Sequence, residues 1–248
     1  MERTIVLFAS GTSGTGSMRR LHCKLLNKPK EDTRFVEQFI LDGEPQKIPT
    51  ATIPCDGGMY LFNLPPQFNR AQPIIHHKFI INFRDPRDRL CNQYHWEFVH
   101  PKPHLSQAQL NAHKDKVRNE GIDAWVLRNV DTGYYDNFWW LLSQPNIDFC
   151  VQSYARLCLD FDSYVTRSCE YLNIPYTEKV RALLSDEAPN QLTKNSKWIG
   201  NIWQGSDNSP GRFKHELKPE TIAELNQAFE NVLANMKKYD TDFAYTYE

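Results

Sequence analysis

Residues 10 to 17, SGTSGTGS, combine three glycines with five hydroxyl side chains in eight positions. The apolar run VLFA precedes them, and the helix-favouring stretch MRRLHCKLL follows. Glycines let a ligand approach the backbone closely, and the free N–H groups at the start of a helix donate hydrogen bonds to anions. The segment therefore predicts a phosphate-binding turn between a strand and a helix.

This turn lacks the lysine found in the phosphate loops of ATPases and kinases. Gly11 and Gly16 have the spacing of that motif, but Ser17 and Met18 stand where it requires Lys and then Ser or Thr. The pattern therefore disfavours a kinase or an ATPase. A glycine-rich turn that binds no ligand is the alternative interpretation of this segment alone.

A second candidate phosphate contact lies in FIINFRDPRDRLCNQYHWE, residues 79 to 97. Its continuous apolar start predicts a strand buried on both faces of a parallel sheet, and that strand ends at Arg84. A guanidinium in this place can bind a phosphate by paired hydrogen bonds. The alternative is that Arg84 and its charged neighbours up to Asp88 only form ion pairs that cap the next helix.

Together the two segments resemble the cofactor signature of the sulfotransferases that use 3′-phosphoadenosine 5′-phosphosulfate (PAPS). In that family a PKSGTT-like loop after the first strand wraps the 5′-phosphosulfate, and an arginine at a later strand end binds the 3′-phosphate. Residues 151–175, VQSYARLCLDFDSYVTRSCEYLNIP, resemble the family segment whose tyrosine approaches the adenine. Residues 209–225, SPGRFKHELKPETIAEL, resemble its closing region. The segments occur in the family's order along nearly the whole chain.

The resemblance implies one α/β sulfotransferase domain over residues 1–248, with a P-loop-like phosphosulfate loop. Its implied reaction transfers a sulfuryl group from PAPS to a hydroxyl or amine of a small-molecule acceptor, releases adenosine 3′,5′-bisphosphate (PAP) and needs no metal. The implied cofactor contacts are Thr12, Ser13, Gly14, Thr15, Gly16, Ser17, Arg84, Asn92, Tyr154 and Arg212.

Several of these positions depart from the family pattern. Thr12 stands in place of the loop's basic residue, which stabilises charge on the bridging oxygen. Asn92 replaces the usual serine, although its amide can still donate a hydrogen bond. Residues 206–208, SDN, replace an Arg-Lys-Gly triplet before Gly211, so Arg212 is expected to help rebuild that part of the 3′-phosphate site.

The catalytic groups must also differ from one branch of the family. Asn63 precedes Leu-Pro where the cytosolic branch has a catalytic histidine, and an amide cannot act as a base. Glu37 in FVEQFI matches the E-x-x-F-F pattern of the branch that uses a carboxylate, so it is the expected base; a solvent-facing strand residue is the alternative. Asp56 and the pair His76–His77 are reserves.

The missing lysine requires a cation from another part of the chain. Arg19 is the expected catalytic cation, because it follows the loop on the next helix. Arg20 and Lys47 are the alternatives.

Aromatic and acidic side chains gather in DAWVLRNVDTGYYDNFWWLL, residues 123 to 142. Tyr134 and Tyr135 beside Asp131 can form a pocket for a cationic acceptor. That pocket would fit a bacterial enzyme of secondary metabolite biosynthesis that sulfates an amine or guanidine. The alternative is that these aromatic residues belong to the helical core.

Hydrophobic patterning predicts the elements that position these residues. Apolar runs predict strands at residues 3–9, 34–41, 78–84 and 148–154, a short element at 59–64, helices at 17–28 and 161–172, mainly helical structure from 87 to 140 and a final helix from Pro219. Strands that alternate with helices predict a mainly parallel sheet flanked by helices. Ligands bind such sheets beyond the carboxyl ends of the strands, where the glycine-rich turn lies.

Composition excludes several classes of protein. The 248 residues carry a formal net charge of −1, without the basic excess of a nucleic-acid or membrane-surface protein. No apolar run reaches the ~20 residues that cross a bilayer. The six scattered cysteines fit reduced thiols in the cytoplasm, and prolines interrupt the only histidine group that suggested a metal.

Three functional classes remain open from the sequence. They are an active PAPS-dependent sulfotransferase, a non-catalytic relative that binds PAP or another nucleotide, and a small-metabolite kinase. The sequence leaves the oligomeric state and the acceptor atom open as well.

Overall fold

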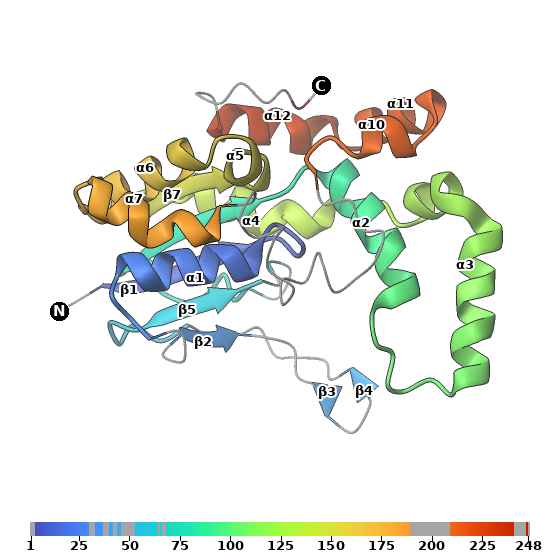
Figure 1. Cartoon of the computed structure of the whole chain (residues 1–248), viewed down its shortest axis with the longest axis horizontal. Helices are drawn as coiled ribbons and strands as arrows, with labels where there is room; N and C mark the ends of the chain where they lie inside the picture. Colours follow the sequence, from blue (N-terminus) through green and yellow to red (C-terminus); the bar gives the residue numbers. More distant parts are fainter. Residues whose placement is uncertain are drawn as a thin grey trace.

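Five parallel strands form the centre of the computed structural model, in the order β2-β5-β1-β6-β7 (Figure 1). Their bounds are β1 Thr4–Ala9, β2 Thr33–Val36, β5 Met59–Phe62, β6 His77–Phe83 and β7 Asp148–Ser153. The short strands β3 (Ile40–Leu41) and β4 (Glu44–Pro45) pair separately and antiparallel. The structure describes residues 3–29, 33–36, 40–41, 44–45, 53–63, 65, 68–188, 209–240 and 247.

Helices cover both faces of this sheet (Figure 1). They are α1 Thr15–Leu25, α2 Pro86–Val99, α3 Gln107–Arg128, α4 Asp136–Ser143, α5 Tyr154–Leu159, α6 Phe161–Leu172, α7 Glu178–Leu184, α10 Phe213–Glu216, α11 Pro219–Ala228 and α12 Glu230–Tyr239. Single 3₁₀ turns are η3 (Gly133–Tyr135) and η4 (Ser185–Glu187). None of the described helices is long and apolar enough to cross a membrane.

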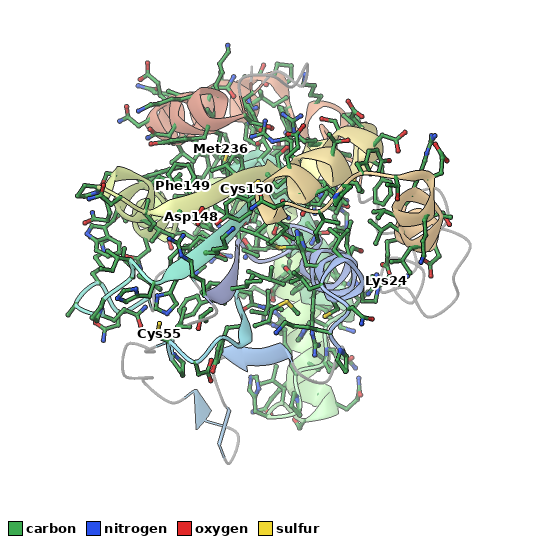
Figure 2. All side chains as sticks on the ribbon, turned by 90° about the vertical axis from the view of Figure 1, so that its left-hand side faces the viewer. Lys24, Cys55, Asp148, Phe149, Cys150 and Met236 are labelled. Atoms are coloured by element: carbon green, nitrogen blue, oxygen red, sulfur yellow. The ribbon has the colours of Figure 1, made fainter. Side chains whose placement is uncertain are left out.

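Alternate residues of the central strand β1 pack on opposite faces of the sheet, as the pleat of a strand requires. Leu7 belongs to one buried cluster with Met18 of α1, whereas Phe8 belongs to the other, which includes Phe138 of α4 and Met236 of α12. Figure 2 shows the two sides: Met236 lies on α12 beside strand β7, and Lys24 lies on α1. β1 is buried along its whole length, so the sheet fixes the start of the glycine-rich turn.

The structure confirms the parallel α/β architecture and corrects some element bounds. α1 begins at Thr15, two residues before the expected start, because Gly14 of the glycine-rich turn is its N-cap. The strand expected at 34–41 is β2, which ends at Val36, followed by the separate strand β3. The expected final helix is divided into α11 and α12 at Phe229, which stays fully buried and keeps the apolar spacing continuous.

Helix α5 was not expected from the sequence. Ser153 accepts a hydrogen bond from the backbone N–H of Arg156 at 3.1 Å and so starts a helix directly after β7. Asp160 caps the next helix, α6, by accepting from the N–H of Ser163 at 3.1 Å. Two caps this close make α5 too short for a clear helical period.

Candidate functional site

The turn between β1 and α1 follows a tightly constrained backbone path. Thr12 and Gly14 both have positive φ, 64° and 75°. A Cβ at Gly14 would lie 3.0 Å from ring atom Cδ2 of Tyr154 and 3.0 Å from Cδ2 of Leu157. Glycine is therefore required at residue 14 both for its conformation and for its close contact with α5.

The neighbouring strand β6 holds this turn through Asn82. The Asn82 side-chain N–H donates to the Ser13 carbonyl at 2.5 Å, and the Ser10 N–H donates to the Asn82 carbonyl at 2.9 Å. The Ser13 hydroxyl in turn donates to the Ser10 carbonyl at 2.7 Å. These bonds engage carbonyls of the turn, so its conformation is fixed before any ligand binds.

The start of helix α1 faces the same turn. Gly14 is its N-cap, no side chain of the described residues caps it, and its first turn, which holds Thr15, Gly16 and Ser17, contains no acidic residue. The first N–H groups of a helix lack partners inside the helix and carry its positive dipole end. The backbone here is therefore arranged to bind an anion.

Arg84 reaches this turn from the end of β6. Its backbone N–H donates to the Ser10 hydroxyl at 3.1 Å, and its Nη1 donates to the Thr12 carbonyl at 3.1 Å. The side chain is only 2% exposed, yet its Nε and Nη2 have no hydrogen-bond partner among the described residues. Because burying unpaired donors of a charged group is costly, this arrangement fits an anionic ligand.

Tyr154 joins the turn to Arg84. Its ring contacts the position of Gly14, and the Arg84 guanidinium carbon lies 4.6 Å from the ring centroid. Burial raises the pKa of the Tyr154 phenol well above its usual value, so the group stays neutral. Asn92 lies on α2 and is 3% exposed, with no partner for its Oδ1 in the described part of the chain.

No family model and no curated protein matches this chain, but solved structures do. Retinol dehydratase in complex with retinol and PAP is 14% identical, with 99% of this chain and 84% of that chain covered and a TM-score of 0.60. Retinol dehydratase in complex with androsterone and inactive cofactor PAP is 16% identical, with 99% of this chain and 83% of that chain covered and a TM-score of 0.61. Mouse sulfotransferase SULT7A1 complexed with PAP is 14% identical, with 98% of this chain and 90% of that chain covered and a TM-score of 0.62. This chain has a sulfotransferase fold.

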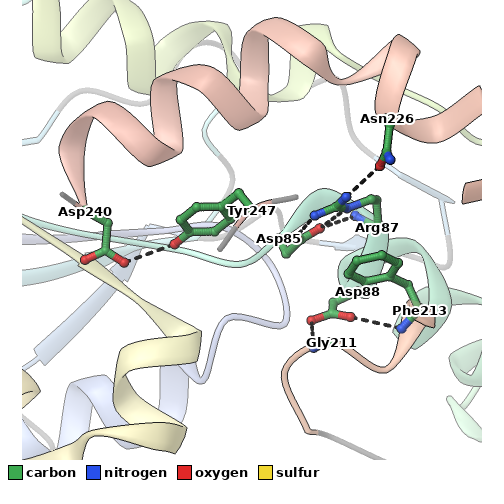
Figure 3. A network of polar contacts seen from close by, with 8 residues as sticks. All are labelled: Asp85, Arg87, Asp88, Gly211, Phe213, Asn226, Asp240 and Tyr247. Carbon is green, nitrogen blue, oxygen red and sulfur yellow. Dashed lines mark hydrogen bonds and ion pairs between the residues drawn. The ribbon is translucent and has the colours of Figure 1, made fainter. Parts of the chain in front are cut away.

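Within this sulfotransferase fold, Arg212 is held in an ion pair. Its Nε and Nη2 donate to Oε1 of Glu216 at 2.9 and 2.5 Å, and His95 lies 3.0 Å from the other carboxylate oxygen. Asp88 accepts the N–H groups of Gly211 and Phe213 and so holds this segment against α2 (Figure 3). A contact of Arg212 with PAP stays a prediction, since these guanidinium nitrogens already contact a carboxylate.

Tyr134 and Tyr135, expected at the acceptor, contact groups of the chain itself. The Tyr134 hydroxyl accepts the Gly11 N–H at 2.7 Å, and its ring lies 3.6 Å from the guanidinium carbon of Arg89. Tyr135 is fully buried, whereas Asp131 is exposed and accepts the Tyr134 N–H at 3.1 Å. A cationic acceptor on the Tyr134 ring would have to displace Arg89, so this role stays a prediction without support from the geometry.

The cations expected near the loop have different surroundings. Arg20 donates to Glu187 at 2.8 Å and to the Ser17 hydroxyl at 3.1 Å, which leaves its charge paired. Arg19 is half-buried on α1, and its catalytic role stays a prediction. Lys47 lies outside the described residues.

The expected base, Glu37, also lies outside the described residues. Of the reserves, Asp56 is exposed and accepts the Tyr60 hydroxyl at 2.7 Å, and His76 is exposed. His77 is buried with its Nε2 3.2 Å from the Pro54 carbonyl, which is a structural contact. Among the described residues no group of three His, Cys, Asp or Glu is placed to hold a metal ion.

Sequence reasoning missed Asn82 and Arg89. Asn82 is the single polar residue in the apolar run FIINF, and that isolation is a usable signal. Arg89 has no such signal, because the aromatic residues that it contacts, Tyr134 and Tyr135, lie 45 and 46 positions further along the chain. It also lines a pocket of about 480 Å³ between α2 and α3, formed by Arg89, Gln93, Trp96, Glu97, Trp125, Asn129, Val130 and Asp131.

Proposed function

We propose that this chain is a PAPS-dependent sulfotransferase that transfers a sulfuryl group to a hydroxyl or amine of a small-molecule acceptor. The observation that carries the proposal is the pairing of an uncapped helix start with a buried guanidinium whose Nε and Nη2 lack partners in the described chain. The two features follow adjacent strands, β1 and β6. PAP, which is present in the similar structures, carries phosphates at two separated positions and would satisfy both.

The residues of this chain would divide the cofactor between them. Backbone N–H groups from Gly14 to Ser17 would hold the 5′-phosphosulfate, and Arg84 with Asn92 would hold the 3′-phosphate. Tyr154 would contact the adenine as the family resemblance implies. PAPS supplies the sulfuryl group; the protein supplies position and charge, and these are the main sources of catalysis in such transfers.

The acceptor hydroxyl or amine must give up a proton to a base. Glu37 is the proposed base for the acceptor proton, and the acceptor is proposed to be a small natural product, for which the tyrosines and aspartates of residues 131–136 suggest a cationic group. A cytoplasmic location is part of the proposal, and the six free cysteines support it. The absence of a metal requirement follows from the family chemistry and is proposed on that ground.

A ligand screen tests the cofactor assignment directly. We expect PAP to raise the unfolding free energy by about 2.7 kcal/mol at a hundredfold excess over its Kd. Adenosine 5′-phosphosulfate, which lacks the 3′-phosphate, should stabilise far less, and Mg-ATP should not stabilise at all. Stabilisation by Mg-ATP alone would instead support the metabolite kinase, and no shift with millimolar PAP would overturn the proposal.

Thr12 and Asn63 favour a second candidate, a non-catalytic protein that binds PAP. Neither residue can replace the lysine or the histidine used in the family. Turnover separates the two candidates: release of PAP from PAPS, measured over a panel of alcohols, phenols and amines, is expected for the enzyme. PAP binding without release in any reaction would favour the binding protein.

A further inference from the structure

The loop of the proposed sulfotransferase contains no cationic side chain. Residues 10–17 are glycine, serine and threonine only, and Thr12 stands where the family has its basic residue. During sulfuryl transfer the bond from sulfur to the 5′-phosphate oxygen breaks and its electron pair stays on that oxygen. A positive group close to this oxygen lowers the barrier, so the charge must come from elsewhere.

Arg89 lies near this loop, and Tyr134 contacts both of them. Its guanidinium carbon is 3.6 Å from the centroid of the Tyr134 ring and 5.9 Å from that of Tyr135. The Tyr134 hydroxyl accepts the N–H of Gly11, the residue before Thr12, at 2.7 Å. The contacts therefore lead from the guanidinium, through Tyr134, to the backbone of Gly11, the residue before the position of the family's basic residue.

The charge of Arg89 has no ion-pair partner among the residues that the structure describes. The side chain is 7% exposed, its Nε has no hydrogen-bond partner and no carboxylate forms an ion pair with it in the described parts of the chain. Burial raises the pKa of Tyr134, although Arg89 opposes this, so the phenol keeps its proton and is no counterion. A buried, uncompensated guanidinium attracts an anion.

The surroundings of Arg89 also match the place where donor and acceptor must meet. Arg89 lines the pocket of about 480 Å³ to which α2 contributes Trp96 and α3 contributes Trp125. This volume is in the range of small-molecule sites. Arg89 therefore stands between a cavity for an acceptor and the anion-binding loop.

We propose that Arg89 supplies the positive charge that Thr12 does not, by contacting the oxygens of the sulfuryl group and the leaving phosphate oxygen. This inference rests on the proposed function. In the step that it serves, the acceptor oxygen or nitrogen forms a bond to sulfur, the bond from sulfur to the 5′-phosphate oxygen breaks, and the acceptor proton passes to a base. PAP lacks the sulfuryl oxygens but keeps the leaving phosphate oxygen, so its binding depends on Arg89 less than that of PAPS.

The test compares Arg89→Gln, Arg89→Lys and the double variant Arg89→Gln/Thr12→Lys with wild type. We expect Arg89→Gln to lower kcat by roughly 10²–10³ and to weaken PAPS more than PAP in calorimetry. Arg89→Lys should recover part of the rate, and a lysine at position 12 should recover at least tenfold. The matched control is Arg181→Gln, since Arg181 is an exposed residue of α7 paired with Asp162 at 3.0 Å.

Each result is decisive once melting temperatures show that the variants fold. Wild-type turnover in Arg89→Gln, or an equal loss of PAPS and PAP affinity, would overturn the inference. Recovery of rate by Thr12→Lys would support it, because that substitution restores a positive charge at the position where the family has its basic residue. Failure of the proposed function is seen separately, in wild-type protein that binds no PAP; if PAP binds without turnover, the PAPS-to-PAP affinity ratio decides.

Discussion

Arg84 and Arg87 are buried three residues apart, yet their guanidinium groups have opposite surroundings. Arg87 donates to both oxygens of Asp85, at 3.0 and 2.7 Å, and to Asn226 at 2.6 Å, over the ring of Phe213 (Figure 3). Within the described residues, Arg84 has one hydrogen bond from its guanidinium, to the Thr12 carbonyl. Burial of a cation therefore does not by itself indicate a ligand; the completeness of its pairing does.

The same contrast between paired and incompletely paired arginines separates the side of the C-terminal helices from the side of the glycine-rich turn. On the side of the C-terminal helices, Arg156 donates to Asp240 at 3.1 and 2.5 Å, and Tyr247 donates to the same carboxylate at 3.0 Å. On the side of the loop, Arg84 and Arg89 stack on tyrosine rings with nitrogens left over. The arginine on the first side is paired with a carboxylate of the chain, whereas the arginines on the second side keep nitrogens without a partner in the described residues, as the proposed anion site requires.

The largest expected effect is on stability, from breaking a fully paired arginine. Arg87→Met leaves the buried carboxylate of Asp85 without its partner, so we expect a loss of about 3–5 kcal/mol in unfolding free energy. Urea denaturation measures this, and PAP affinity of the folded variant should stay near wild type. Arg181→Met, at an exposed pair, should change stability by less than ~0.5 kcal/mol. A stable Arg87→Met protein that no longer binds PAP would contradict the assignment of Arg87 to the fold and of Arg84 to the ligand.

The next effect is on affinity, from removing the incompletely paired arginine. Arg84→Ala should weaken PAP by about 2–4 kcal/mol, because a charged contact to the 3′-phosphate is lost. Its stability should fall far less than that of Arg87→Met, since no carboxylate is left unpaired. Calorimetry with PAP and with adenosine 5′-phosphosulfate measures the contrast. If both ligands weaken equally, Arg84 shapes the loop through Thr12 and does not bind the 3′-phosphate.

The sequence predicts the backbone architecture around the glycine-rich turn well because its signals are local. A buried strand, a glycine-rich turn and a helix start are adjacent in the chain, and Arg84 follows directly on a second apolar run. Parallel strands place their carboxyl ends at one edge, which brings the two segments together. The structure confirms this fold and places Arg84 at the turn.

The sequence predicts side-chain partners poorly wherever they depend on tertiary contacts or on short local helices. The partner of Arg89 lies 45 residues away, and no local pattern links the two. Arg212 was expected at the 3′-phosphate, but the short helix α10 places Glu216 one turn later, where it pairs with the guanidinium. The role of Glu37 stays a prediction from a family pattern, because it lies outside the described residues.

The smallest expected effect concerns pH, where the two sides have opposite signs. On the C-terminal side, burial and the nearby Asp85 raise the pKa of Asp88 to about 6, so its contribution to stability is full at low pH and is lost as pH rises towards 6. On the side of α1, burial lowers the pKa of His22 to about 4. Its contribution is full above its ordinary pKa and is lost as pH falls towards 4.

The two contributions should nearly cancel between pH 4.5 and 6.5, so wild-type stability is expected to be almost flat there. Each amounts to about 2 kcal/mol across this window, from the cost of 1.36 kcal/mol per pKa unit. In Asp88→Asn only the contribution of His22 remains, so this variant should lose stability on acidification. In His22→Gln only the contribution of Asp88 remains, so this variant should gain stability on acidification. Urea denaturation of the three proteins at pH 4.5, 5.5 and 6.5 measures the slopes. If the unfolding free energy depends on pH with the same slope in both variants, neither buried group titrates in this range. The two sides then do not differ in their response to pH.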